Sequence, residues 1–181
     1  MPTPILINGI LASGISGHLS TNNYVSIATQ TVGSGGASSI TFSSIPSTYT
    51  HLQLRISGLA GSADAKFYLN SDTTDSNYYM HLLAGNGTSA YAGGANIPYL
   101  DEGDTNPSAP AVYIIDILDY TNTNKYKTIK NLWGYDYNAN NITGRVGVHS
   151  FLWSNTAAVN TITLANRTWS SGSNFALYGI K

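Results

Sequence analysis

The sequence predicts an all-β protein, a jelly-roll-like β-sandwich with an extended N-terminal arm. Only 9% of the 181 residues are charged, against about 25% in ordinary soluble proteins. Ser, Thr, Asn and Gly occupy the polar positions instead, and these residues favour turns and caps over helix interiors. No run with helical periodicity is long enough to matter. About ten short apolar runs alternate with turn clusters, which is the spacing of a sandwich or jelly roll.

The first twenty residues, MPTPILINGILASGISGHLS, contain no charged side chain. Proline and glycine interrupt the apolar run, so we expect neither a secretory signal nor a membrane-spanning helix here. The interpretation that remains is an arm, residues 1–23, that docks on its own domain or on a neighbouring subunit, because exposed apolar side chains need a partner surface. The predicted docking residues are Ile5, Leu6, Ile7, Ile10, Leu11, Ile15, His18 and Leu19.

From Tyr24 onward, short β-like runs alternate with turns, and we expect one sandwich domain over residues 24–181. The clearest run is YTHLQLRIS, in which Leu52, Leu54 and Ile56 alternate with polar neighbours. This period of two is typical of a half-buried strand. The strands predicted in this first half of the domain are 24–32, 38–42, 49–57, 65–70 and 78–83.

The second half of the domain begins after a segment with almost no alternation, Ala84 to Pro110. Its many Gly, Ala, Asn and Pro residues predict a long surface loop. Turn-rich segments such as TNTNK and NANNITG separate the runs that follow. The strands predicted there are 111–120, 126–137, 145–153, 159–165 and 174–180.

The run AVYIIDILDY, residues 111–120, has apolar residues on both faces, which predicts a strand covered on both sides. Asp116 interrupts it, and a charge in such a strand needs a partner. The alternatives are Arg145, Lys130 or a seam between subunits. The predicted subunit seam consists of Tyr113, Ile115, Asp116 and Ile117.

The search for reactive side chains favours a protein without enzymatic activity or cofactor. Neither a G-x-S-x-G elbow nor an H-E-x-x-H motif occurs, and the four histidines lack ligand spacing. The eight Lys and Arg residues are scattered, so we expect no nucleic-acid partner. A weak calcium candidate is the acidic cluster Asp101, Glu102 and Asp104. A solvated turn is the interpretation we prefer for it.

The 13 tyrosines and three tryptophans can fill the core or form a displayed surface. Trp133 and Trp153 lie in predicted strands and are expected in the core. Trp169 lies in a predicted loop, and Tyr91 and Tyr99 lie in the long one. Aromatic side chains on loops can stack on sugars or anchor an interface. We therefore predict an exposed aromatic rim of Tyr91, Tyr99 and Trp169.

Three segments of the domain carry recognisable motifs. They are I-x-F-x-S-I-P-x-T-Y-x-x-L, then N-x-D-x-x-x-x-N-Y with L-x-G-x-G, and the closing L-Y-G-I. The matching residues of the first two are Ile40, Phe42, Ser44, Ile45, Pro46, Thr48, Tyr49, Leu52, Asn70, Asp72, Asn77, Tyr78, Leu83, Gly85 and Gly87. Together with the N-terminal ILASGISGHL, these segments resemble a family of tailed-bacteriophage virion proteins. The resemblance covers most of the chain and implies a jelly-roll sandwich, a homotrimer and a place on the phage particle, with no catalytic residues.

The favoured hypothesis is a capsid decoration (cement) protein on the outer surface of the phage head. Its arm would bind the major capsid protein or another virion protein and stabilise the particle. The alternative is a tail-fibre or tail-tip domain that binds host-surface glycans. In both cases the protein is made in the host cytoplasm and ends in the virion, and a membrane partner is not expected.

Overall fold

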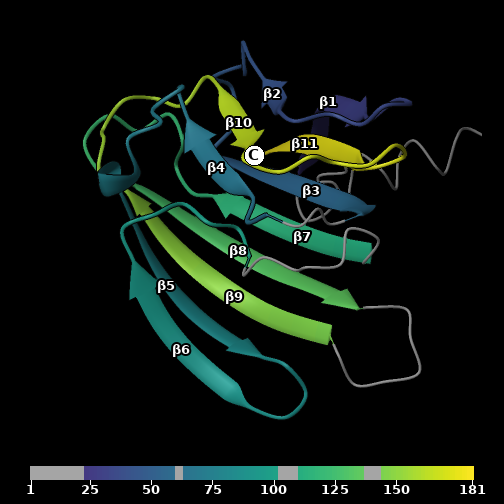
Figure 1. The fold of residues 1–181 in the computed structure, drawn as a ribbon. Helices are drawn as coiled ribbons and strands as arrows, with labels where there is room; N and C mark the ends of the chain where they lie inside the picture. Colours follow the sequence, from purple (N-terminus) through teal and green to yellow (C-terminus); the bar gives the residue numbers. More distant parts are fainter. Residues whose placement is uncertain (1–22, 60–62, 102–109, 137–143) are drawn as a thin grey trace, which may run out of the picture.

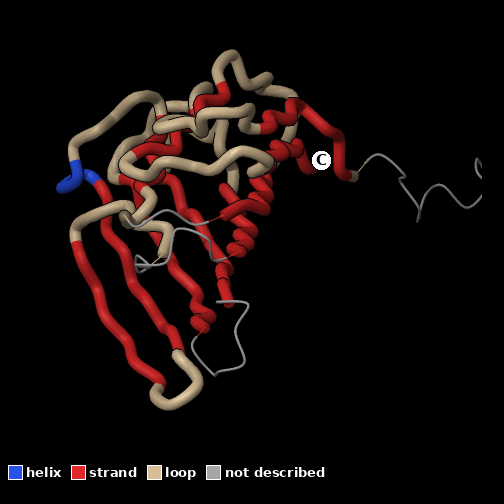
Figure 2. Tube along the Cα trace, turned by 45° about the vertical axis from the view of Figure 1, so that its right-hand side comes forward, coloured by secondary structure: helices blue, strands red, loops and turns tan. Residues whose placement is uncertain are grey.

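The computed structural model describes residues 23–59, 63–101, 110–136 and 144–181. The predicted docking residues of the arm lie outside this part of the chain. Within it, the protein forms two antiparallel β-sheets and one short 3-10 helix, η1 (Asp75–Asn77) (Figures 1 and 2). The prediction of an all-β sandwich is confirmed.

The large sheet has eight strands in the order β1-β11-β3-β7-β8-β9-β5-β6, and the small sheet has the order β2-β10-β4. The strands of the large sheet are β1 (Tyr24–Thr31), β3 (His51–Leu59), β5 (Tyr78–Gly85), β6 (Ala90–Ala95), β7 (Pro110–Ile117), β8 (Lys127–Asp136), β9 (Gly144–Trp153) and β11 (Asn174–Ile180). Those of the small sheet are β2 (Ile40–Phe42), β4 (Lys66–Leu69) and β10 (Ile162–Ala165). The small sheet lies at the β1–β11–β3 end, and β8, β9, β5 and β6 extend away from it (Figure 1).

The order of the strands is jelly-roll-like. The first four strands alternate between the two sheets, so that β1 and β3 lie in the large sheet and β2 and β4 in the small one. The last two strands then return between them: β10 pairs with both β2 and β4, and β11 pairs with both β1 and β3. This nested wrapping of the outer strands resembles that of a double-sheet jelly roll, while β5 to β9 all lie in the large sheet.

The core follows from the period-two alternation along each strand. On β8, for example, Ile129 and Trp133 are buried, whereas Leu132 is exposed. Trp133 and Trp153 are each 1% exposed, which confirms their predicted place in the core. We call the side of the large sheet that carries the buried residues its inner face, and the opposite side its outer face.

The segment between β4 and β5 is held by hydrogen bonds from motif residues. The Asp72 carboxylate accepts from Trp153 Nε1 at 2.8 Å and from Asn77 Nδ2 at 2.9 Å. Partial burial acts to raise the pKa of Asp72, but these donors outweigh it and lower the pKa. The Tyr78 hydroxyl donates to the Asp72 carbonyl and accepts from Leu69 N–H, both at 2.9 Å. The N-x-D-x-x-x-x-N-Y motif thus closes one end of the sandwich.

The first and last motifs meet in the structure. The ring of Tyr49 packs on Gly179, where a Cβ atom would lie only 2.2 Å from Tyr49 Cγ. The Tyr120 hydroxyl donates to the carbonyl of Pro46. The Tyr49 N–H in turn lies 3.4 Å from the Tyr120 oxygen. The residues that carry the resemblance therefore serve packing between segments that are distant in the sequence.

The predicted long loop from Ala84 to Pro110 contains a strand. β6 pairs antiparallel with β5, and Tyr99 forms an isolated bridge with Lys66. The sequence AYAGGA does not indicate this strand. β6 is the edge of the sheet and is exposed along most of its length, so its residues show no alternation of apolar and polar side chains. The prediction of an irregular loop was wrong for residues 90–95.

Candidate interaction surface

The outer face of β7, β8, β9 and β5 is the main apolar surface of the described chain. Among the described residues, seven of the nine exposed large apolar side chains belong to these four strands or to the residue that follows β7. They are Tyr79, Leu83, Val112, Ile114, Leu118, Leu132 and Val146. A patch of this kind on a soluble domain usually marks an interaction site.

The strand register places these side chains in rows across the sheet. Leu83 lies opposite Val148, Val148 opposite Leu132, and Leu132 opposite Ile114. The next row is Gly85, Val146, Gly134 and Val112. We call these two rows the apolar face. Its members Leu83, Leu132 and Val146 are 57%, 52% and 59% exposed and line a shallow hollow of about 350 Å³.

A polar row borders the apolar face on one side. It runs His81, Ser150, Lys130, Asp116 and Gln53 from β5 to β3. Gln53 Nε2 donates to Asp116 Oδ1 at 2.8 Å. Gln53 Oε1 accepts from Arg55 Nε at 2.7 Å. The row contains both signs of charge, and it sets a polar limit to the apolar face.

The hydrogen-bond partner found for Asp116 is an amide, not one of the two expected cations. Asp116 Oδ1 accepts from the Gln53 amide, while Lys130 is its neighbour in the β7–β8 ladder. Arg145 lies near the start of β9, opposite Tyr135, and is not next to Asp116. A neutral amide could not be singled out from the sequence, because Gln53 lies 63 residues away from Asp116.

The other residues of the predicted subunit seam face the wrong way for that role. Tyr113, Ile115 and Ile117 are at most 1% exposed and pack in the chain's own core. Only Asp116 lies on the outer face, and its strand presents Val112 and Ile114 there. The structure thus corrects the residues of the seam: Tyr113, Ile115 and Ile117 belong to the core, and the side chains that β7 exposes are Val112 and Ile114.

The predicted aromatic rim is not brought together as one surface. Trp169 is fully buried, so its predicted exposure was wrong. Tyr91 is half-buried on β6 and packs against the core, opposite Ala84. Tyr99 is also half-buried, and the Lys66 ammonium lies 5.6 Å from its ring centroid. The two tyrosines lie on different segments, and neither forms a stacking platform with Trp169.

The acidic cluster resolves into a buried ion pair. Glu102 and Asp104 lie outside the described residues, whereas Asp101 is 1% exposed and lies 2.7 Å from Arg167 Nη1. The Tyr113 hydroxyl donates to Asp101 and accepts from Arg167 Nη1 at 2.7 Å. Among the described residues, no group of three or more His, Asp and Glu side chains could hold a metal ion. Asp101 therefore serves the core and not a solvated turn.

The electrostatics of this cluster set burial against charge pairing. Burial raises the pKa of Asp101, although the Arg167 charge and the Tyr113 hydroxyl act to lower it. Burial acts to lower the pKa of Arg167, but the adjacent Asp101 carboxylate and Tyr113 outweigh it and raise the pKa. Burial and the Asp101 charge raise the pKa of Tyr113 well above its usual value, so its hydroxyl stays protonated and donates. Arg167 Nε also donates to the carbonyl of Ala63 at 2.6 Å. The cluster joins β7 to three connecting segments, β3–β4, β6–β7 and β10–β11.

A buried histidine lies behind the apolar face, on the inner side of β9. His149 is fully buried, and its ring centroid lies 5.7 Å from that of Trp133 and 5.3 Å from that of Phe151. Burial lowers the pKa of His149 to about 4, although the carbonyls of Leu100 and Tyr99 act in the opposite direction. The imidazole is therefore neutral near pH 7 and serves packing.

We predict that His149 makes the free energy of unfolding fall as the pH drops from 6.5 to about 4. In this window the unfolded chain binds a proton on His149 that the native state excludes, so stability is full above it and lost below it. A depression of this size corresponds to about 3 kcal/mol. Urea unfolding at a series of pH values measures it. His149→Gln should flatten this part of the profile, and His81→Gln, an exposed control, should not. An unchanged slope in His149→Gln would contradict the prediction.

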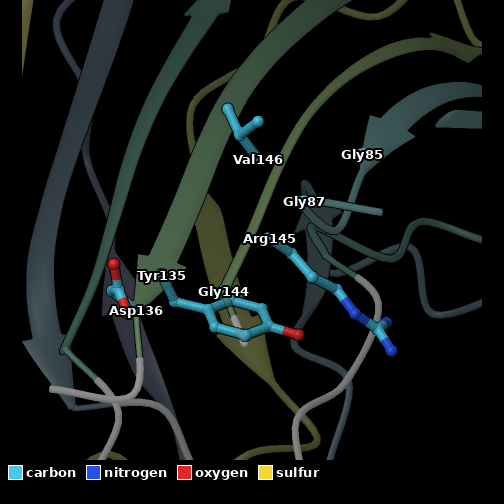
Figure 3. Close-up of a pocket in the computed structure, with 7 residues that line it drawn as sticks. All are labelled: Gly85, Gly87, Tyr135, Asp136, Gly144, Arg145 and Val146. Carbon is cyan, nitrogen blue, oxygen red and sulfur yellow. The ribbon is translucent and has the colours of Figure 1, made fainter. Parts of the chain in front are cut away.

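A second hollow, of about 280 Å³, lies at the ends of β8 and β9 (Figure 3). The Tyr135 ring and the Arg145 side chain extend beside each other from paired positions, and Val146 lies further along β9. Gly85 and Gly87 form the opposite side. Three of its seven lining residues are glycines, which offer little chemistry for a specific ligand.

Comparison with known proteins found no matching family model, no matching curated protein and no matching solved structure. The structure itself defines the class, an all-β sandwich of jelly-roll-like order with an apolar outer sheet face. In the described part of the chain, no helix is long and apolar enough to cross a membrane. Sequence reasoning missed the apolar face, and its signal was the apolar side chains at outward-facing positions: Leu83 on β5, Val146 and Val148 on β9, Leu132 on β8, and Val112 and Ile114 on β7.

Proposed function

We propose that this chain is a non-enzymatic structural protein of a tailed-bacteriophage virion, and that it decorates the outer surface of the head. The observation that supports a structural role best is the apolar face: a chain with 9% charged residues displays an uncharged sheet surface that needs a cover. Three of the described ionisable groups support the same role, because Asp72, Asp101 and Arg167 make hydrogen bonds or ion pairs within the fold. The assignment to a phage particle rests on the resemblance of the three motifs.

The head is favoured over the tail because the predicted aromatic rim does not form one exposed surface. The glycan-binding alternative depended most on Trp169, and Trp169 is buried. Tyr91 and Tyr99 alone are half-buried and separate. A decoration protein needs no such rim. It needs surfaces that bind neighbouring virion proteins, and many weak contacts per particle then add through multivalency.

The proposal predicts a high copy number and a more resistant particle. Quantitative mass spectrometry of purified virions should find on the order of hundreds of copies, since a decoration protein follows the symmetry of the head lattice. Particles assembled without the protein should release their DNA at a lower temperature or after a milder osmotic shock. A few copies to a few dozen per particle would assign the protein to the tail instead, and unchanged particle stability would contradict a stabilising role.

A truncated variant tests whether the arm attaches the protein to the particle. The chain without residues 1–20 is expected to fold, because the described core consists of residues beyond position 30. It should bind poorly to particles that lack the full-length protein. If this variant joins the particle as well as the full-length chain does, the arm is not the attachment segment. A variant that fails to fold would show instead that the arm belongs to the core.

A further inference from the structure

We propose that two copies of this chain pair face to face through the apolar face, about a two-fold axis that runs along the strands between β8 and β9. The partner is a second copy because the pattern of residues on this face is complementary to itself. The inference goes beyond the proposed function and does not depend on where the protein is located. A two-fold pair is a dimer, which distinguishes it from the homotrimer that the resemblance implies.

The apolar row is the first element of self-complementarity. Its order from β5 to β7 is Leu83, Val148, Leu132 and Ile114. A two-fold axis between β8 and β9 places β8 of one copy against β9 of the other, and β7 of one copy against β5 of the other. Because the axis runs along the strands, each row faces the same row of the second copy. Leu132 then packs on Val148 of the second copy, and Leu83 packs on Ile114 of the second copy. All four positions find an apolar partner.

The adjacent row matches valines with glycines. Its order is Gly85, Val146, Gly134 and Val112. Under the same axis Val146, which is 59% exposed, faces Gly134 of the second copy. Val112, which is 57% exposed, faces Gly85 of the second copy. Each protruding side chain thus meets a position without a side chain, as close packing between two sheets requires.

The fold of one chain does not account for these two glycines. A Cβ atom on Gly134 would lie 3.4 Å from the nearest atom, the carbonyl oxygen of Arg145, and one on Gly85 would lie 3.6 Å from that of Ser89. Both are ordinary van der Waals contacts, and glycine weakens a strand. In contrast, a Cβ atom on Gly147 of the inner face would lie 2.6 Å from the Trp133 ring. Gly147 is needed inside the chain, whereas Gly134 and Gly85 are explained by a surface that approaches from outside.

The polar row also pairs with itself. Its order is His81, Ser150, Lys130 and Asp116. The axis sets Asp116 against His81 of the second copy, and Lys130 against Ser150 of the second copy. An imidazole N–H can donate to a carboxylate, and an ammonium can donate to a hydroxyl. No charge lies directly opposite a like charge, so the row is compatible with this arrangement.

The area is sufficient for a specific pair. Four strands and four outward-facing rows, the last with Tyr79 and Leu118 at its ends, cover roughly 19 Å by roughly 27 Å at the usual spacings. Because side chains project from the sheet, the accessible area is larger than the flat area of ~500 Å². It therefore approaches the area of a standard interface, about 800 Å² per partner. Because two copies of one sheet have the same twist, an axis along the strands keeps the distance between the faces uniform.

The test exchanges the positions of the protruding valine, Val146, and of the glycine that faces it, Gly134. In sedimentation equilibrium at total concentrations up to about 100 µM, within reach of weak specific pairs, the full-length chain should sediment as a dimer. Gly134→Val places two valines against each other at two symmetric points, and it should weaken the association constant by about tenfold or more. The double variant Gly134→Val with Val146→Gly restores the match in reversed positions, and it should recover the dimer.

Each result has a defined meaning. A monomer for the full-length chain, a trimer that Gly134→Val leaves unchanged, or a dimer that Gly134→Val leaves unchanged would overturn the proposal. So would a double variant that associates no better than Gly134→Val, provided that its unfolding curve shows a folded chain. Tyr126→Ser, which removes an exposed aromatic outside the face, is the control and should leave the dimer intact. The copy number in virions tests the proposed function separately, since neither result determines the other.

Discussion

Asp101→Ala should lower the free energy of unfolding by about 3–5 kcal/mol, because it leaves the Arg167 guanidinium buried without its counter-charge. Arg167 is 2% exposed, and its Nη1 lies 2.7 Å from Asp101 Oδ2. For a chain of this size the loss corresponds to a fall of about 10 °C in Tm. Urea unfolding and thermal melts followed by circular dichroism measure both quantities.

An exposed pair provides the control for this prediction. Asp119 pairs with Lys125, whose side chain is 53% exposed. Asp119→Ala should cost at most about 1 kcal/mol, as is usual for surface ion pairs. If Asp101→Ala cost no more than Asp119→Ala, the ion pair of Asp101 with Arg167 would not be buried in solution. The calcium interpretation of Asp101 makes a different prediction, since removal of the carboxylate would then abolish stabilisation by added Ca²⁺.

The alternation along each strand was enough to predict the class of fold. Leu52, Leu54 and Ile56 are all buried on one side of β3, as their period of two indicates. Local patterns could not reveal which strands are neighbours. Leu132 and Val146 read as ordinary strand residues in the sequence, and only the β8–β9 register shows that they belong to one exposed surface. The apolar face is therefore a property of the topology.

Contacts between distant segments were equally hidden. Asp101 and Arg167 are 66 residues apart, and each lies in an irregular connection. A carboxylate in a Gly- and Pro-rich segment is more often solvated, which is why the sequence suggested a turn or a calcium ligand. The motif residues are the opposite case, because the sequence itself pointed to them. Tyr49 and Gly179 belong to two separate motifs, and the structure explains both by one contact, the ring of Tyr49 on a position without Cβ.

The same reasoning applies to Trp169, for which a loop position suggested exposure. The residue bridges to Ala37, which brings this connection over the edge of the core. Its ring centroid lies 5.0 Å from that of Phe175 and 6.1 Å from that of Tyr113, both edge-on. The Arg167 guanidinium lies 5.4 Å from the centroid of the same ring. Trp169 thus packs beside the buried ion pair and covers it.

We expect Trp169→Ala to lower the free energy of unfolding by about 3–5 kcal/mol, because it opens a cavity next to Phe175 and Tyr113. Denaturant titration measures this loss. Since Trp169 and Asp101 share Arg167 and Tyr113 as neighbours, the double variant Trp169→Ala with Asp101→Ala should lose less than the sum of the two single losses. The glycan-binding hypothesis expects the reverse, a stable Trp169→Ala variant. A loss below about 1 kcal/mol, within the range of surface substitutions, would therefore place the indole outside the core.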